Sequence, residues 1–314
     1  MQRTVALTGI SGFIGQAIAH HLCQAGVTVR GLIRTSKKIS RLEHPEITLV
    51  NGNLDNRESL HRLLEGCSSI VHCAGSIRGC KKDDFLPTNV RGVSNLLHVC
   101  LSQPSPPKFI HISSVVAREP SLSPYAWSKQ EGERVIQQQA QSLPWVILRP
   151  PAVYGPNDEA LVPLFRLARK GIGLQLGPRE AKFSLIYVQD LAGVVLRSIE
   201  DNNTRSTILE VDDGLSGGYS WESIFRFLNP RMKIHLRIPP ELLWLLGRSN
   251  EMLSQLLGYA PLFTTGKVAE LHHHDWVCDS LQARQQLGWT PQIPIEEGLR
   301  RLFASDSLLL SKKN

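Results

Sequence analysis

The stretch Thr8-Gly9-Ile10-Ser11-Gly12-Phe13-Ile14-Gly15 decides the fold. It follows an apolar run at residues 4–8 and opens an amphipathic helical pattern over residues 12–25. In such a strand–turn–helix the first glycine permits a tight turn, the second lets a pyrophosphate approach, and the third lets helix and strand pack closely. The free N–H groups at the start of the helix favour anions. We therefore expect this turn to bind a dinucleotide through Gly9, Ser11, Gly12, Phe13, Ile14 and Gly15.

Short apolar runs alternate with helical patterns through the first half of the chain, which is typical of βαβ units. The runs predict strands over residues 4–8, 28–33, 47–50, 69–73, 108–113 and 145–149. The patterns between them predict helices over residues 12–25, 57–64, 89–101 and 125–141. The expected fold class is α/β, a Rossmann doubly wound parallel sheet with a smaller mixed α/β domain.

The character of the chain changes after Pro150-Pro151, where turns become frequent and strands short. We assign residues 1–150 to a dinucleotide-binding Rossmann domain. Residues 151–314 form a smaller substrate-binding domain over the carboxyl ends of the strands, where ligands bind in such folds. Residues 185–199 predict a strand–helix unit that packs back on the first domain. Residues 238–262 predict amphipathic helices broken by turns.

Composition describes an ordinary enzyme of 314 residues, with 42% hydrophobic and 20% charged residues. The net charge is +7, but Lys and Arg are dispersed without aromatic interleaving, so we expect no nucleic-acid partner. The positive surface would attract an anionic cofactor or substrate, or anionic lipid headgroups. His272-His273-His274 lacks further ligands at metal-binding spacing, so no metal site is expected.

Cysteine usage and hydropathy predict the compartment. The six cysteines show no paired spacing, which fits reduced thiols in a cytosol. The chain enters its first strand within a few residues of Met1, which leaves no room for a signal peptide. No apolar run approaches the ~18 residues that span a bilayer. We expect a cytoplasmic protein, at most peripheral to a membrane.

Tyr125 and Lys129 stand four residues apart in a helical pattern, which places both side chains on one face. An ammonium beside a phenol favours the phenolate, and this would bring a pKa near ~10 closer to neutrality. Hydride transfer needs such a group, because the substrate oxygen gains or loses a proton as the carbon gains or loses hydride. Ser113-Ser114 follows a predicted strand and supplies a further hydroxyl.

The end of the second strand bears on cofactor choice. NAD enzymes usually place an acid there for the ribose diol. Ile33 holds that position and Arg34 follows, so no carboxylate repels a 2′-phosphate and Arg34 can grip one. Lys37-Lys38 are expected to lie in a solvated loop. We predict NADP(H) as the preferred cofactor and NAD(H) as the alternative.

Together these motifs resemble the extended short-chain dehydrogenase/reductase superfamily, in its NAD(P)-dependent epimerase/dehydratase branch. The resemblance covers nearly the whole chain, and its further motifs are His72-Cys73-Ala74-Gly75, Asn89, Arg149 to Pro156, Tyr187 to Leu191 and Leu287 to Leu299. It implies that Ser114 hydrogen-bonds the reacting oxygen and that Tyr125 delivers or removes its proton. Lys129 would lower the tyrosine pKa and bind the nicotinamide ribose.

The resemblance also implies the path of the cofactor. Asn53 and Leu54 would flank the adenine, and Asn89 would brace the active-site network. The residues expected to line the rest of the dinucleotide are Cys73, Ala74, Gly75, Pro150 and Val153. A homodimer through helices of the first domain is usual for such proteins.

Several residues differ from those that sugar-nucleotide enzymes carry at the same positions, and these differences disfavour some reactions of the family. Val115-Val116 follow Ser114 where dehydratases carry an Asp-Glu pair, which disfavours dehydration. Ala152 and Phe183 stand where those enzymes often carry Asn and Arg, which favours a less polar substrate. Residues 239–247 and 252–263 are more apolar than a sugar site requires and resemble 3β-hydroxysteroid dehydrogenase-like and bacterial ceramide reductase-like members. Periodicity leaves open whether these leucines serve a substrate or simply pack the small domain.

The leading hypothesis is an oxidoreductase that interconverts a ketone and a secondary alcohol in a hydrophobic small molecule such as a 3-oxo-sphingolipid or a sterol-like substrate. One alternative is a nucleotide-sugar epimerase or dehydratase. Another is a non-catalytic NADP-binding subunit resembling the accessory subunit of respiratory complex I. The intact Ser114, Tyr125 and Lys129 argue against a purely structural role.

Overall fold

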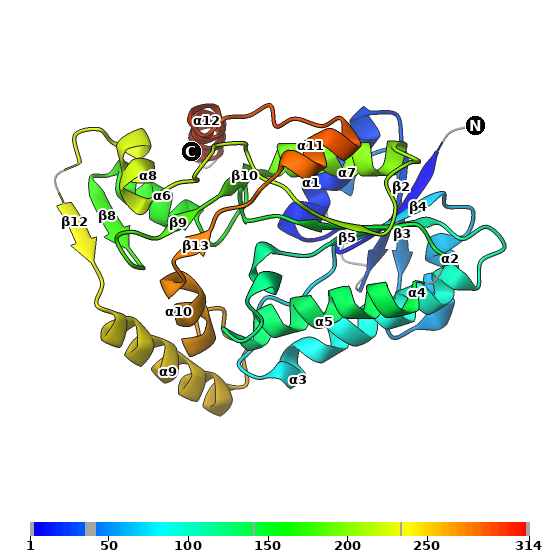
Figure 1. Ribbon diagram of the computed structural model, residues 1–314, viewed down its shortest axis with the longest axis horizontal. Coiled ribbons are helices and arrows are strands. Elements are labelled where there is room, and N and C mark those ends of the chain that lie inside the picture. Colours follow the sequence, from blue (N-terminus) through cyan, green and yellow to red (C-terminus); the bar gives the residue numbers. More distant parts are fainter. Residues whose placement is uncertain (1–2, 35–41, 141, 233, 312–314) are drawn as a thin grey trace.

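A parallel seven-stranded sheet forms the centre of the computed structural model, which describes residues 3–34, 42–140, 142–232 and 234–311 (Figure 1). The strand order is β11-β6-β5-β4-β1-β2-β3, and every pairing is parallel. The strands are β1 (Thr4–Thr8), β2 (Thr28–Ile33), β3 (Ile47–Asn51), β4 (Ser69–His72), β5 (Lys108–Ile112), β6 (Trp145–Arg149) and β11 (Thr207–Glu210). The order reverses between β1 and β4, where ligands bind in doubly wound sheets. The predicted α/β class is confirmed.

Helices cover both faces of this sheet, which is why its strands are nearly continuous apolar runs. One face packs against α1 (Phe13–Gln24), α7 (Val188–Glu200) and α11 (Leu281–Leu287). The other face packs against α2 (Arg57–Leu64), α4 (Gly92–Leu101) and α5 (Pro124–Gln139). The sheet is therefore buried, and its polar chemistry is confined to the strand ends.

The second half of the chain contributes to this sheet as well as to the smaller lobe. Strand β11 pairs with β6 at one sheet edge. The segment β10 (Leu185–Tyr187) leads directly into α7, which packs against α1. The predicted division at residue 150 itself stays a prediction.

The smaller lobe is built from short paired strands and helices. Its parallel pairs are β7 (Ala152–Tyr154) with β10, β8 (Ile172–Gln175) with β12 (Ile234–Arg237), and β9 (Lys182–Phe183) with β13 (Asp275–Trp276). Its helices are α6 (Val162–Arg169), α8 (Trp221–Leu228), α9 (Pro240–Leu257), α10 (Thr265–His272) and α12 (Ile295–Ser311). Tyr154 anchors its core through edge contacts with Phe165 and Tyr187, at ring-centroid distances of 6.1 and 5.3 Å.

Two expectations about helices are wrong. The segment over residues 238–262 contains one continuous helix, α9, because Pro239 and Pro240 lie at its start, where a helix tolerates proline, and Pro261 lies beyond its end. Gly258 ends it in the left-handed conformation, with φ 70°. The helix expected from Asn89 is preceded by α3 (Lys82–Phe85) and a π-helical turn, Leu86–Arg91. Across the described ranges, no helix has both the length and the hydrophobicity needed to cross a bilayer.

Candidate active site

The glycine turn is built for close approach of backbone segments. Gly9 has φ +73°, and a Cβ there would lie 2.6 Å from the nitrogen of Ala74. A Cβ at Gly15 would lie 2.1 Å from the carbonyl oxygen of Gly9. A Cβ at Gly12 would meet only that same oxygen, at 3.3 Å, so the outer side of the turn is open. Helix α1 begins at Phe13 with no acid in its first turn, so its positive end fits a pyrophosphate.

Thr8 ties this turn to the end of β4. Its Oγ1 lies 2.7 Å from Nδ1 of His72 and accepts a hydrogen bond from the nitrogen of Ala74 at 3.2 Å. The segment Cys73–Gly75 is thereby held beside the glycine turn, on the path predicted for the dinucleotide. A Cβ at Gly75 would lie 3.5 Å from Oδ1 of Asn89, so this segment reaches from the glycine turn to Asn89.

The other predicted cofactor residues lie along the same edge of the sheet. Arg34 is exposed directly after β2, and Lys37-Lys38 lie outside the described residues. Asn53 accepts a hydrogen bond from the nitrogen of Asp55 at 2.9 Å, and Leu54 packs beneath Gly92 of α4. The remaining members are exposed or partly buried at the turn, namely Ser11, Phe13 and Ile14.

Pro150 and Val153 occupy the far end of the predicted cofactor path. The carbonyl oxygen of Pro150 accepts a hydrogen bond from the nitrogen of Val115 at 2.9 Å, which joins the ends of β5 and β6. Val153 lies in β7 and is partly buried. Pro150 is therefore placed one strand away from Ser114.

Ser114, Tyr125 and Lys129 converge at the carboxyl end of β5. Ser114 starts a 3₁₀ turn, Val115–Arg118, directly after the strand. Tyr125 stands at the start of α5 and hydrogen-bonds Ser114. Lys129, one helical turn on, donates to the carbonyl oxygen of Ile112 at 2.8 Å. The structure thus brings the three predicted catalytic residues together.

The electrostatics of Tyr125 differ from the expectation. Burial raises the pKa of the phenol well above its usual range, Glu270 raises it further, and the hydrogen bond from Ser114 opposes these effects. The expectation that Lys129 brings this pKa toward neutrality is therefore wrong. Burial instead lowers the pKa of Lys129 to about 8, although Glu133 opposes the shift. At neutral pH Tyr125 is a protonated phenol, suited to giving a proton.

Asn89 braces this arrangement from the π-helical turn. It accepts a hydrogen bond from the nitrogen of Ser76 at 2.7 Å and donates to the oxygen of the same residue at 3.0 Å. It also donates to the hydroxyl of Ser128 at 2.9 Å, and Ser128 donates to the carbonyl oxygen of Tyr125 at 2.7 Å. The wide turn presses against α5, because a Cβ at Gly132 would lie 2.5 Å from the Asn89 oxygen. Such turns are frequent at functional sites.

Sequence reasoning missed a buried ion pair beneath the catalytic residues. Arg149 donates from Nε to Oε1 of Glu133 at 2.9 Å and from Nη2 to Oε2 at 2.5 Å. Ser113 also donates to Glu133, which is 2% exposed. The spacing held a clue, because Tyr125, Lys129 and Glu133 recur every four residues on one helix face.

Sequence reasoning also missed Glu270 of α10, which is 4% exposed. It accepts hydrogen bonds from Ser123 at 2.5 Å and from Lys267 at 2.8 Å. Because Ser123 caps α5, Glu270 joins the smaller lobe to the start of the catalytic helix. No local pattern predicts this contact, since the two residues are 147 positions apart.

Three described positions, Phe183, Ala152 and Lys182, bear on the comparison with sugar-nucleotide enzymes. The ring of Phe183 packs on Trp221, with centroids 5.2 Å apart, so it points into the core of the smaller lobe. Ala152 is exposed at the start of β7. Lys182 precedes Phe183 in the short strand β9, and its side chain is exposed to solvent.

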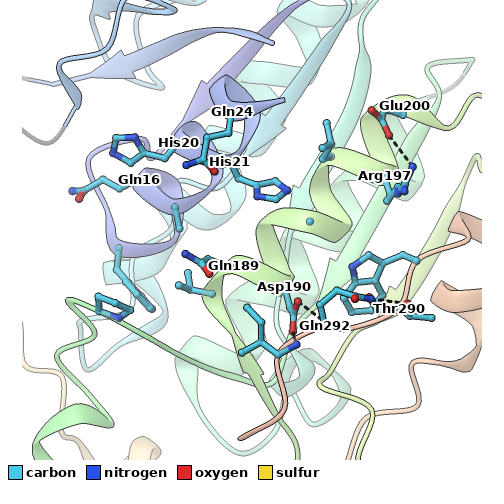
Figure 2. A pocket seen from close by; sticks show the side chains of 18 of the residues that line it. Gln16, His20, His21, Gln24, Gln189, Asp190, Arg197, Glu200, Thr290 and Gln292 are labelled. Atoms are coloured by element: carbon cyan, nitrogen blue, oxygen red, sulfur yellow. Dashed lines mark hydrogen bonds and ion pairs between the residues drawn. The ribbon is translucent and has the colours of Figure 1, made fainter. Parts of the chain in front are cut away.

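A groove of about 1000 Å³ lies elsewhere, between α1 and α7 (Figure 2). Figure 2 shows Asp190 there, where it accepts hydrogen bonds from the nitrogens of Gln292 and Ile293 at 3.0 and 2.9 Å. Of the predicted site residues that the structure describes, Phe13 alone lines this groove. The candidate active site is therefore located by its converging residues, not by cavity size.

Comparison with known proteins identifies the family of the chain. A sequence model described as the NAD dependent epimerase/dehydratase family matches residues 5–211. The chain is 31% identical to a ceramide reductase of Caulobacter vibrioides, over 88% of this chain and 86% of that protein. It is 29% identical to a 2-alkyl-3-oxoalkanoate reductase of Shewanella oneidensis, over 95% and 85%.

A solved structure shows the same fold. It is a UDP-glucuronic acid 4-epimerase of Bacillus cereus in complex with UDP-glucuronic acid and NAD, with a TM-score of 0.76 and 18% identity over 98% of this chain and 99% of that one. The matching family is described as NAD-dependent, and the epimerase structure contains NAD. With the glycine turn, the Ser114–Tyr125–Lys129 group and these matches together, the chain belongs to the NAD-dependent epimerase/dehydratase family, as an NAD(P)-dependent oxidoreductase.

Proposed function

We propose that this protein reduces a ketone to a secondary alcohol on a hydrophobic, lipid-like substrate, with NADP(H) as its preferred cofactor. The observation that carries the proposal is the state of Tyr125. Its phenol is hydrogen-bonded to Ser114, and because tyrosine ordinarily titrates near pH ~10 and burial raises this pKa further, it holds a proton at neutral pH. A proton donor at this position serves reduction, in which the carbonyl oxygen must gain a proton as its carbon gains hydride.

The residues divide the chemistry among them. When bound, NAD(P)H supplies the hydride. Ser114 donates a hydrogen bond to the carbonyl oxygen as negative charge develops there. Tyr125 then gives its phenolic proton to that oxygen. Lys129, charged below a pH of about 8, binds the nicotinamide ribose.

A hydrophobic substrate is supported by what the site lacks. Phe183 turns into the core where a sugar-nucleotide enzyme would place a phosphate-binding arginine, and Ala152 offers no polar contact. The relatives named ceramide reductase and 2-alkyl-3-oxoalkanoate reductase act, by their names, on ceramide and on 3-oxoalkanoates. We therefore place the substrate among 3-oxo-sphingolipids or sterol-like ketones.

The NADP(H) preference rests on Arg34. It is exposed directly after β2, where a guanidinium can bind a 2′-phosphate through two hydrogen bonds. Ile33 leaves the position of the usual acid without a negative charge. NAD(H) is the alternative cofactor.

Two other functions have less support. Epimerisation of a nucleotide sugar requires residues that bind its diphosphate, and Phe183 and Ala152 cannot do so. A non-catalytic NADP-binding subunit has no use for a protonated Tyr125 bonded to Ser114. The homodimer and the contact with lipid headgroups stay proposals about partners.

The test is oxidation of NADPH by the purified protein on a substrate panel. A 3-oxo-ceramide and a 3-ketosteroid should be reduced, whereas UDP-glucose should neither react nor stabilise the protein against heat. Tyr125→Phe should abolish turnover and keep NADPH binding, while Tyr259→Phe, which removes an exposed phenol outside the site, should be unchanged. Retained turnover in Tyr125→Phe would remove Tyr125 as the acid, and stabilisation by UDP-glucose would favour the epimerase.

A further inference from the structure

Helix α9 turns its apolar side chains toward solvent. Leu256 is 82% exposed and Leu257 is 68% exposed, which is rare for leucine on a soluble surface. The exposed large apolar residues of this helix are Leu242, Trp244, Leu245, Leu246, Met252, Leu253, Leu256 and Leu257. Figure 1 shows α9 at the outer edge of the smaller lobe, next to α10. By helical spacing Trp244 falls beside the buried Glu251, whereas the other seven side chains share one face, which we name the outer face of α9.

The inner side of the same helix is a narrow, mostly polar stripe. Its buried residues are Leu243, Gly247, Glu251 and Ser254. Oε1 of Glu251 accepts hydrogen bonds from the nitrogen and the hydroxyl of Thr265, both at 2.7 Å. A Cβ at Gly247 would lie 2.9 Å from the backbone of Thr264. These contacts fix the rotation of the helix, so its apolar residues cannot turn inward.

This orientation is the reverse of the usual one, in which a surface helix turns its apolar stripe to the core and its polar residues to water. Exposing so many leucines costs free energy in water, at about 25 cal/mol for each Å² of apolar surface. A helix that the fold holds with its apolar face outward is typically one whose apolar face binds another apolar surface or phase.

The charges near α9 indicate which phase. Exposed Arg231 and Arg237 precede the helix, and the side chain of Arg248 is 54% exposed although it pairs with Glu251. Glu241 is the exposed acid of the helix, whose second half, residues 249–257, carries no exposed charge. Cations at one end and an uncharged apolar face match an anionic lipid surface. A second copy of this chain, at net charge +7, would instead bring like charges together.

We propose that the outer face of α9 inserts into the headgroup and acyl boundary of an anionic lipid bilayer, with its leucines and Met252 in the apolar layer. The helix then lies in the plane of the surface and does not cross it. Arg231 and Arg237 contact the lipid phosphates. The interaction does not depend on which ketone the enzyme reduces.

The attachment of α9 relates this surface to the active site. Ser254 lies 3.7 Å from the sulfur of Cys80, and the nitrogen of Gly79 donates to the carbonyl oxygen of Pro261 at 3.0 Å. These contacts join α9 to the loop that follows the cofactor residue Gly75. On the other side, α9 packs on α10, whose Glu270 binds the cap of the catalytic helix. A bilayer on α9 therefore borders the elements that enclose Tyr125.

Vesicle co-sedimentation of the full chain tests this proposal. The protein should pellet with vesicles of phosphatidylcholine and phosphatidylglycerol in equal parts, and less with phosphatidylcholine alone. Leu256→Ser/Leu257→Ser should weaken partitioning on the order of a hundredfold, at roughly tenfold for each leucine. The matched control Leu215→Ser/Leu281→Ser removes two exposed leucines elsewhere, 42% and 55% exposed, and should bind as the wild type does. Equal binding of both double variants would overturn the proposal.

The electrostatic part is tested separately. Arg231→Gln/Arg237→Gln should lower binding to anionic vesicles by roughly fivefold for each arginine, and added salt should have the same direction of effect. If the wild type binds no vesicles, and sedimentation velocity shows a dimer that Leu256→Ser/Leu257→Ser dissociates, the outer face is an interface between copies and the proposal is wrong. NADPH turnover on a soluble ketone should be the same in all these variants, so this result is separate from the proposed reaction.

Discussion

The ammonium of Lys129 donates a hydrogen bond to the carbonyl oxygen of Ile112, 2.8 Å away. Ile112 ends β5 and Lys129 belongs to α5, so this bond holds the catalytic helix at the strand end that also carries Ser114. The contact places Lys129 where it is 6% exposed, and this burial lowers its pKa to about 8. The buried position of Lys129 at the end of β5 therefore also explains why its pKa is lowered.

Activity should follow this titration. Lys129 loses its charge as the pH rises through about 8, because burial disfavours the charged form, so kcat/KM should be level below that pH and fall above it. Lys129→Met should lower kcat on the order of a hundredfold and remove this inflection. The surface variant Lys170→Met should keep both. A wild-type profile that stays level across this pKa would contradict the assignment.

The ion pair of Glu133 and Arg149 should dominate the stability of the catalytic helix. Their side chains are 3% and 18% exposed, so Glu133→Gln leaves a poorly solvated guanidinium without its partner. We expect urea unfolding to show a loss of about 3 kcal/mol. Glu131→Gln breaks the surface pair with Arg134 on the same helix and should cost less than about 1 kcal/mol. Similar losses of unfolding free energy in the two variants would show that the buried ion pair stabilises the protein no more than the surface pair does.

Gly15→Ala should damage both stability and cofactor binding. Its Cβ would lie 2.1 Å from the rigid carbonyl oxygen of Gly9, so the turn must move, at a cost on the order of 3 kcal/mol. Gly193→Ala is the matched control, because in α7 its Cβ would meet Trp289 at an ordinary 3.5 Å. That variant should gain about 0.5–1 kcal/mol. Thermal unfolding and NADPH titration measure both effects, and normal NADPH binding by Gly15→Ala would remove the turn as the phosphate site.

Arg34→Ala should erase the preference for NADPH over NADH. Losing charge-assisted hydrogen bonds to a 2′-phosphate should weaken NADPH binding by about tenfold or more and leave NADH binding unchanged. Arg205→Ala removes the same charge next to β11, at the opposite edge of the sheet, and serves as the control. Fluorescence titration of both nucleotides gives the ratio. Equal affinities in the wild type would disprove the NADP(H) preference.

The fold was largely predictable because its determinants are local. The predicted strands over residues 4–8, 28–33 and 145–149 have the bounds of β1, β2 and β6. A strand buried on both faces must be apolar along its length, and this pattern is visible without tertiary contacts. The π-helical turn before α4 was not predictable, because its width depends on packing against Gly132 of α5.

The candidate site divides in the same way. Tyr125 and Lys129 are linked by helical spacing, and Ser114 by its position after a strand. Glu270 reaches the site from a distant segment, and the raised pKa of Tyr125 depends on burial and on that carboxylate. Spacing alone therefore predicted the participants and misjudged their electrostatics.

The sequence by itself determined the glycine turn and the catalytic spacing, because each depends on backbone geometry within a few residues. It also showed that residues 239–263 are apolar, but not where those side chains point. Periodicity defines the faces of a helix and cannot say which face meets the protein. Tertiary structure decided this for α9, since the bonds of Glu251 to Thr265 and the close approach at Gly247 hold the polar stripe inward. The leucines are left outside as a consequence.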